Sequence, residues 1–138
     1  MTITVTFMDA LHRLEESGNV DVIASLFADD ATLANPLVIH DGTEEQTAKR
    51  FWKTYRYAFS DIQSTFLNVV ENGKAAAIEW QSEGVIDGQS VSYSGVSVLE
   101  FDDQQIRAFR AYFDPRELIA RAGASEPDAT PSDVESAS

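Results

Sequence analysis

Apolar residues recur at helical spacing in the first part of the chain. Phe7, Leu11 and Leu14 lie at i, i+4 and i+7, which predicts an amphipathic helix, and Thr6 is a candidate N-cap for it. Gly18-Asn19 interrupts this pattern, and Asn19 can cap a second helix. The apolar stripe of that second helix is formed by Val22, Ile23, Leu26 and Phe27.

A third helical pattern follows a short segment rich in β-forming residues at 31–39, which Asn35-Pro36 interrupts. Thr43 and Gln46 form a capping-box pattern, so we expect a helix over about 43–59. Its apolar positions are Ala48, Phe51, Trp52, Tyr55 and Phe59.

The second half of the chain alternates between apolar and polar residues, as strands with one buried face do. Strands are expected over 64–70, 75–85, 89–101 and 105–113. Short turns separate these segments, so they predict an antiparallel meander. Asp114-Pro115 then begins a short closing helix that ends at Gly123.

Each predicted strand has a bulkier face that must pack on the helices. On the last three strands this face contains Ala76, Ile78, Trp80, Ser82, Val91, Tyr93, Ser97, Leu99, Arg107, Phe109, Ala111 and Phe113. The opposite face still carries apolar residues, namely Ala75, Ala77, Val96, Val98, Ile106 and Ala108. Because so much apolar surface is unfavourable in water, we expect this outer face to form a homodimer.

Composition limits the classes of partner. The 138 residues suffice for one domain, and 43% of them are hydrophobic. The formal net charge of −13 and a pI of about 4.3 argue against binding nucleic acid or anionic membranes, which require basic patches. The chain has no cysteine, which excludes disulfides and thiol chemistry.

The domain is expected to cover residues 4–123. Residues 124–138 contain two prolines and four acidic residues but a single valine, which predicts a disordered acidic tail. No apolar run is long enough to span a membrane, and the first nine residues do not form a signal peptide, so a cytoplasmic location is expected.

The order of these elements resembles the SnoaL-like family of the nuclear transport factor 2-like superfamily. The residues that carry the resemblance are F-A-D-D-A-T at 27–32, N-P at 35–36, F-W at 51–52, A-I-E-W at 77–80, S-G-V-S-V-L-E-F at 94–101 and A-Y-F-D-P at 111–115. The resemblance implies an α+β fold in which a cone-shaped, strongly curved, mixed or antiparallel sheet wraps around N-terminal helices, as in a cystatin-like α+β barrel. It also implies an internal apolar pocket.

Relatives in this superfamily include ketosteroid isomerases, limonene-type epoxide hydrolases and polyketide cyclases. The position of the isomerase base is Asn35 here, and the two proton donors fall near Ala10 and Ser97. The Asp-Arg-Asp residues of the epoxide hydrolases fall near Ser82, Trp80 and Ala111. Neither mechanism is therefore supported, because both require a carboxylate to take up a proton.

Three residues are candidates for catalysis. Asn35 could orient a water or a carbonyl, although an Asn before a proline also suits a turn. His40 could act as an acid or base near neutral pH, although a surface histidine in a loop is commoner. Asp114 follows an aromatic strand, but the role of helix N-cap explains this residue completely. His12, the other histidine, is expected to be solvated on the first helix.

The candidate ligand-binding residues lie on the predicted inner surface. Aromatic residues could hold a flat apolar ring and hydroxyls could bond to it; the set is Tyr55, Trp80, Ser82, Ser97 and Phe109. No cluster with metal-ligand spacing and no phosphate-binding loop is found, so neither a metal nor a cofactor is expected.

Two functions remain open from the sequence. One is a cofactor-free isomerase, cyclase, dehydratase or hydrolase that acts on a small hydrophobic cyclic molecule of the polyketide or terpenoid type. The alternative is a non-catalytic module that binds a small ligand or forms a dimer.

Overall fold

The computed structural model describes residues 2–43 and 45–118. Three helices precede or interrupt the first strands: α1 (Ile3–Ser17), α2 (Asp21–Ala24) and α3 (Thr47–Tyr57). The strands are β1 (Phe27–Ala34), β2 (Ile39–His40), β3 (Asp61–Glu71), β4 (Ala75–Ile86), β5 (Gln89–Phe101) and β6 (Ile106–Phe113). The predicted tail over 124–138 and the helix end at Gly123 lie outside the described residues.

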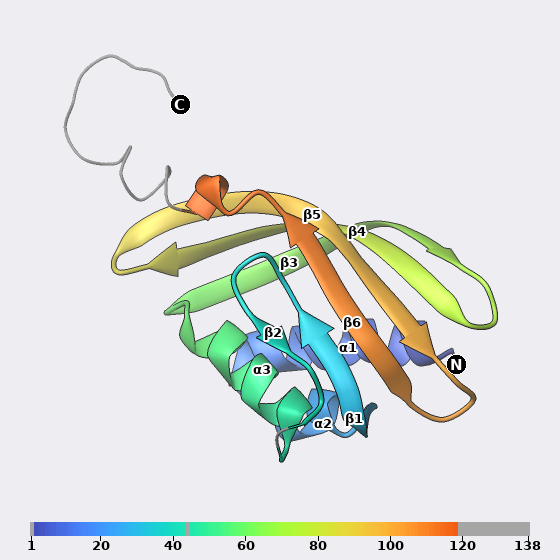
Figure 1. The fold of residues 1–138 in the computed structure, drawn as a ribbon. Helices are drawn as coiled ribbons and strands as arrows, with labels where there is room; N and C mark the ends of the chain where they lie inside the picture. The colour runs from blue at the N-terminus through green and yellow to red at the C-terminus, as the bar shows by residue number, and fades with distance from the viewer. Residues whose placement is uncertain (1, 44, 119–138) are drawn as a thin grey trace.

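The six strands form one curved sheet in the order β2-β1-β6-β5-β4-β3, and Figure 1 shows it curving over α1 and α3. Strands β3 to β6 pair as the predicted antiparallel meander. Strand β1 runs parallel to β6, so the sheet is mixed. The α+β class and the curved sheet are confirmed, but the sheet does not close into a barrel, since β2 and β3 are its two edges.

Helix α1 presents the predicted stripe of Phe7, Leu11 and Leu14 to the core. It begins one turn earlier than predicted, because Thr2 and not Thr6 is the N-cap, with its Oγ1 accepting a hydrogen bond from the Val5 N–H. Gly18 ends the helix in the left-handed conformation.

Helix α2 is shorter than the helix predicted from the apolar stripe that ends at Phe27. It ends at Ala24, and Phe27 belongs to β1 instead, where it pairs with Ile106. The Ile106 N–H donates to the Leu26 carbonyl at 2.8 Å. Pairing with a strand 80 residues away therefore overrides the local helical spacing.

The predicted capping box of α3 is wrong. The helix begins at Thr47, and its N-cap Gln46 has a φ of 56° and makes no side-chain capping bond. Thr43 instead donates from Oγ1 to Asp41 at 2.7 Å. The adjacent Gly42 lies so close to β1 that a Cβ there would stand 2.4 Å from the Asp30 carbonyl oxygen, so this segment packs on the sheet before the helix starts.

The inner faces predicted for β4 and β5 are buried as expected, whereas the start of β6 differs. Glu100 pairs with Ala108 and Phe101 with Ile106, which leaves Arg107 as the extra residue of a β-bulge. Ile106 therefore turns inward and is fully buried. Arg107 lies outside, where it pairs with Asp102 at 2.8 Å and Asp30 at 3.1 Å, so the predicted faces of Ile106 and Arg107 are wrong.

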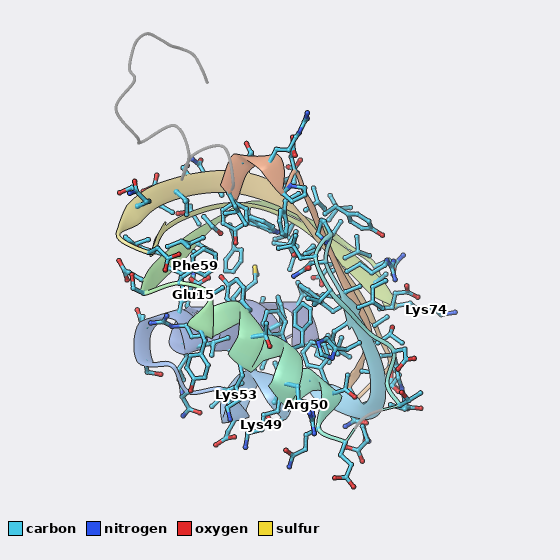
Figure 2. All side chains as sticks on the ribbon, turned by 60° about the vertical axis from the view of Figure 1, so that its left-hand side comes forward. Glu15, Lys49, Arg50, Lys53, Phe59 and Lys74 are labelled. Carbon is cyan, nitrogen blue, oxygen red and sulfur yellow. The ribbon has the colours of Figure 1, made fainter. Side chains whose placement is uncertain are left out.

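The core fills the space between the concave face of the sheet and helices α1 and α3. In Figure 2, Glu15 and Phe59 lie within this space, while Lys49, Arg50 and Lys53 point from α3 away from the sheet. Within the described ranges, no helix has both the length and the apolar character needed to cross a membrane.

Candidate functional site

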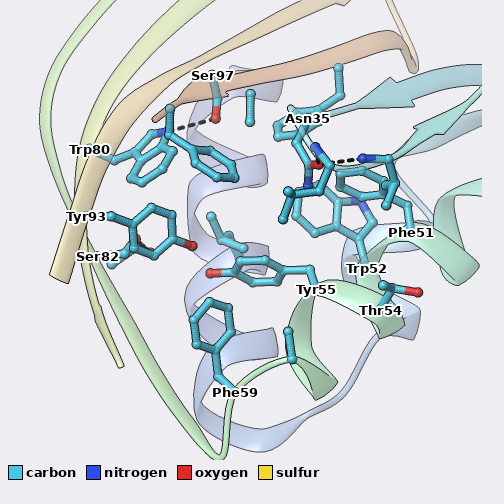
Figure 3. A pocket seen from close by; sticks show the side chains of 18 of the residues that line it. Asn35, Phe51, Trp52, Thr54, Tyr55, Phe59, Trp80, Ser82, Tyr93 and Ser97 are labelled. Carbon is cyan, nitrogen blue, oxygen red and sulfur yellow. Dashed lines mark hydrogen bonds between the residues drawn. The ribbon is translucent and has the colours of Figure 1, made fainter. Parts of the chain in front are cut away.

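A cavity of about 270 Å³ lies between the concave face of the sheet and helices α1 and α3 (Figure 3). Its walls come from both helices, from the β1–β2 connection and from the inner faces of β3 to β6. The lining residues that the structure describes are apolar, aromatic or neutral polar, and none of them carries a charge. Such a cavity suits a neutral molecule with little polar surface.

Ten of the described residues that line the cavity are aromatic. Trp80 and Tyr93 meet edge to face with ring centres 5.3 Å apart, and Phe113 lies 5.2 Å from Tyr93. Across the cavity, Trp52 packs on Phe109 with ring centres 4.9 Å apart. The buried indole Nε1–H of Trp52 has no hydrogen-bond partner among the described residues.

Trp80 is held in place from two sides. Its Nε1–H donates to the Ser97 Oγ at 2.9 Å on the neighbouring strand, as Figure 3 shows. Its ring lies over Gly95, where an added Cβ would be 2.8 Å from the Trp80 ring and 2.3 Å from the Tyr112 carbonyl oxygen. Only glycine fits between the ring and β6 at this position, so a backbone requirement fixes one wall of the cavity.

A buried carboxylate lies behind the cavity wall. Glu15, on α1, is only 4% exposed. Its Oε1 accepts a hydrogen bond from the Ser64 backbone N–H at 2.9 Å, and its Oε2 accepts from the Ser64 hydroxyl at 2.6 Å and from the Tyr55 hydroxyl at 2.7 Å. The Ser64 Oγ also contacts the Ser82 Oγ at 2.6 Å. Tyr55, Ser64 and Ser82 all line the cavity, so the carboxylate reaches it through hydroxyl groups.

Side chains of helix α1 also form hydrogen bonds with the backbone at the edge of the sheet. β3 is an edge strand, and the backbone of Ser64 faces α1 rather than β4. Its N–H donates to Glu15, and its carbonyl lies 2.9 Å from the Nε2 of His12. Because a carbonyl only accepts, His12 must carry a proton on Nε2. His12 is half-buried, so the prediction that it is solvated is wrong.

Two tyrosines share this part of the cavity. Burial raises the pKa of Tyr55 well above its ordinary value, and the charge of Glu15 raises it further. Burial and the same charge also raise the pKa of Tyr93. In Figure 3 the two hydroxyls point toward one another across the cavity. Both groups therefore remain neutral at physiological pH and can exchange hydrogen bonds with a ligand.

Asn35 lines the cavity and also forms a turn. Its Oδ1 accepts hydrogen bonds from the backbone N–H groups of Leu37 at 2.8 Å and Val38 at 3.0 Å. The turn thus occupies the side-chain oxygen, and the Nδ2 amide is the part of Asn35 that is left to meet a ligand.

The predicted ligand-binding residues Tyr55, Trp80, Ser82, Ser97 and Phe109 come together around this cavity. The other two catalytic candidates do not line it. His40 lies in β2, and its ring meets that of Phe51 edge to face, with the ring centres 5.9 Å apart. Asp114 is exposed and accepts from the backbone N–H and the guanidinium of Arg116, which lowers its pKa. These bonds match the helix-start interpretation of Asp114.

Glu15 is a polar residue of the site that is absent from the candidates predicted from the sequence. The signal was present, since Glu15 follows Phe7 and Leu11 at i+8 and i+4 and therefore lies on the buried face of α1. Its partners could not be found in the same way, because Tyr55 and Ser64 lie 40 and 49 residues away. Within residues 2–43 and 45–118, no group of three or more His, Cys, Asp or Glu residues is arranged to hold a metal ion.

Solved structures with the same fold are numerous. An NTF2-like protein from Anabaena variabilis ATCC 29413 superposes with a TM-score of 0.72 at 18% identity, over 81% of this chain and 87% of that one. A protein with a ketosteroid isomerase-like fold from Catenulispora acidiphila DSM 44928, in complex with trimethylamine, gives 0.73 at 19% identity, over 91% and 97%. IdmH from Streptomyces antibioticus, a proposed polyketide cyclase, gives 0.68 at 17% identity, over 89% and 99%.

At these identities the structural matches establish the fold and no more. No curated protein sequence matches the chain significantly. The family model of the SnoaL-like domain, however, matches residues 6–109, which include most of α1 with the buried Glu15, strands β1 to β5, and β6 as far as Phe109. The chain therefore belongs to the SnoaL-like domain family, within the nuclear transport factor 2-like fold.

Proposed function

We propose that the protein binds a small, neutral, mainly apolar ring compound in the cavity between the sheet and helices α1 and α3. The observation that carries this proposal is the uncharged, aromatic lining of a cavity of about 270 Å³. An apolar protein cavity of about 150 Å³ holds one benzene molecule, so this volume suits two fused rings.

The polar groups of the cavity support an oriented ligand. The hydroxyls of Tyr55, Ser64 and Ser82 gather at one place beside Glu15, whereas Trp52 and Phe109 are packed ring to ring. A ring compound with one polar substituent would place that substituent at the hydroxyls and its apolar body against the aromatic wall. Such an arrangement, a few polar groups in an apolar cavity, is typical of small-molecule sites.

Catalysis is the second candidate function, and the buried carboxylate favours it. A cofactor-free isomerisation, cyclisation or hydrolysis of a polyketide or terpenoid compound would need a group that moves a proton. Glu15 reaches the cavity only through the hydroxyls of Tyr55 and Ser64, and three donors already occupy its oxygens. We therefore place ligand binding first, and assign proton transfer to Glu15 and Tyr55 only if turnover is found.

The binding proposal is tested with 2-naphthol and 2-methoxynaphthalene, two neutral bicyclic probes. Both should raise the melting temperature in proportion to the logarithm of their concentration, because they bind the folded state alone. Ala111→Phe places a ring in the cavity and should abolish the shift. Ala108→Phe makes the same change on the opposite face of the same strand and should preserve it. Failure of both probes to bind the unmodified protein would refute the proposal.

The outer face of the sheet supports a second, independent proposal, a homodimer. Val96 and Val98 on β5 and Ala108 on β6 are partly exposed there, and Tyr112 is 55% exposed. Light scattering at micromolar concentration should give twice the chain mass of 15.2 kDa. Val98→Lys should reduce that mass to the monomer value, and a monomeric unmodified protein would contradict the proposal.

A further inference from the structure

The buried charge of Glu15 has no cationic partner among the described residues. Its carboxylate is 4% exposed, and each hydrogen bond it receives comes from a neutral group, namely the Ser64 N–H, the Ser64 hydroxyl and the Tyr55 hydroxyl. A buried carboxylate of this kind orders the hydroxyl protons around it, because every neighbouring donor turns its proton toward the charge.

The direction of each hydroxyl hydrogen bond follows from the number of protons that each hydroxyl group can donate. A serine or tyrosine hydroxyl has a single proton. The protons of Tyr55 and Ser64 are both used on the Oε2 of Glu15. In the contact of 2.6 Å between Ser64 and Ser82, Ser64 has no proton left, so Ser82 must be the donor. The oxygens of Tyr55 and Ser82 therefore offer only lone pairs to the cavity.

We propose that Glu15 makes this part of the cavity a hydrogen-bond acceptor site, formed by the oxygens of Tyr55 and Ser82, which selects ligands that carry a hydroxyl group, such as a phenol, an enol or an alcohol. Tyr93, whose hydroxyl points toward that of Tyr55 in Figure 3, can return a hydrogen bond to the ligand oxygen. The inference rests on the proposed function, since it names the class of ligand for the same cavity.

Replacing Glu15 by glutamine reverses the direction of these hydrogen bonds. The amide oxygen can still accept from the Ser64 backbone N–H, which fixes the orientation of the side chain. The amide nitrogen then donates its two protons to the oxygens of Tyr55 and Ser64. Both hydroxyl protons are released, so the Tyr55 proton turns into the cavity and the acceptor site becomes a donor site.

The test compares the dissociation constants of 2-naphthol, which can donate a proton, and 2-methoxynaphthalene, which can only accept one, by calorimetry at neutral pH. The unmodified protein should bind 2-naphthol about tenfold more tightly, the equivalent of one net hydrogen bond. Glu15→Gln should remove or invert this preference. Glu16→Gln, the same change at the adjacent, exposed position of α1, should preserve it.

A second variant keeps the inference falsifiable if Glu15→Gln does not fold. Tyr55→Phe removes one acceptor oxygen and should reduce the preference for 2-naphthol several-fold while leaving 2-methoxynaphthalene binding nearly unchanged. If both probes bind but their ratio is the same in the unmodified protein, Glu15→Gln and Tyr55→Phe, the acceptor site is refuted and the binding function stands. If neither probe binds the unmodified protein, both proposals are refuted.

Discussion

Glu15 should contribute to stability as well as to ligand selection, because it satisfies the backbone of an edge strand. In Glu15→Ala the Ser64 N–H loses its acceptor, and the side chain of α1 no longer covers it. A buried N–H without a partner costs about 1–3 kcal/mol. The hydroxyls of Tyr55 and Ser64 lose a partner too, but they can rotate toward the cavity, and removal of a buried charge offsets part of the loss. We expect a net destabilisation of about 2 kcal/mol.

This prediction is checked by urea and thermal unfolding followed by circular dichroism. For a domain of this size, about 2 kcal/mol corresponds to a fall in melting temperature of roughly 8 °C. Glu15→Gln retains an acceptor for the Ser64 N–H and should lose less than about 1 kcal/mol. Glu16→Ala is the control, since Glu16 is exposed on the same helix and should change stability by less than about 0.5 kcal/mol.

The result that refutes this reasoning is a Glu15→Ala protein as stable as Glu16→Ala, or more stable. The cost of burying the carboxylate would then exceed the gain from its three hydrogen bonds, as happens for some buried charges. A difference confined to the slope of the urea transition would point instead to a change in the unfolded state.

Three further outcomes are expected. Gly95→Ala should destabilise the fold by about 1–3 kcal/mol and displace Trp80, measured as a change in tryptophan fluorescence, and an unchanged spectrum would contradict the close contact at Gly95. Burial raises the pKa of Tyr55 and of Tyr93, so their contribution to stability persists below pH 10 and is lost above it; their ionisation, followed at 295 nm and assigned with phenylalanine variants, should coincide with unfolding. Bonds to two backbone N–H groups and an arginine lower the pKa of Asp102 to about 2, so its contribution is present above about pH 4 and disappears toward pH 2, and Asp102→Asn should weaken the pH dependence of the melting temperature in this range.

Local patterns were sufficient for most of the secondary structure. The helical stripe of Phe7, Leu11 and Leu14 and the alternation along β4 and β5 place each side chain on its correct face, because helix and strand periodicity depend only on the backbone. The turn at Asp87-Gly88 also follows from the sequence, since both residues adopt the positive φ that a two-residue hairpin requires.

Tertiary contacts decided the features that local patterns missed. Phe27 lies in β1 and not in the predicted helix, because β1 pairs with β6. The bulge at Arg107 places Ile106 on the inner face and Arg107 on the outer face, the reverse of the prediction. Neither event has a local signature, because pairing with a distant strand supplies hydrogen bonds that outweigh weak intrinsic preferences.

The candidate site also combines features that the sequence indicates with features that depend on the tertiary structure. The sequence alone indicated that the inner face is aromatic and contains few charges, and the residues it grouped as ligand-binding candidates line one cavity: Tyr55, Trp80, Ser82, Ser97 and Phe109. It could not determine that a carboxylate on α1 would meet a serine on the edge strand β3, since no periodicity links residues 49 positions apart. Whether a Glu on a helix is a solvated surface charge or a buried group that orients a cavity's hydroxyls depends on which donors the fold brings to it, and that is a property of the tertiary structure.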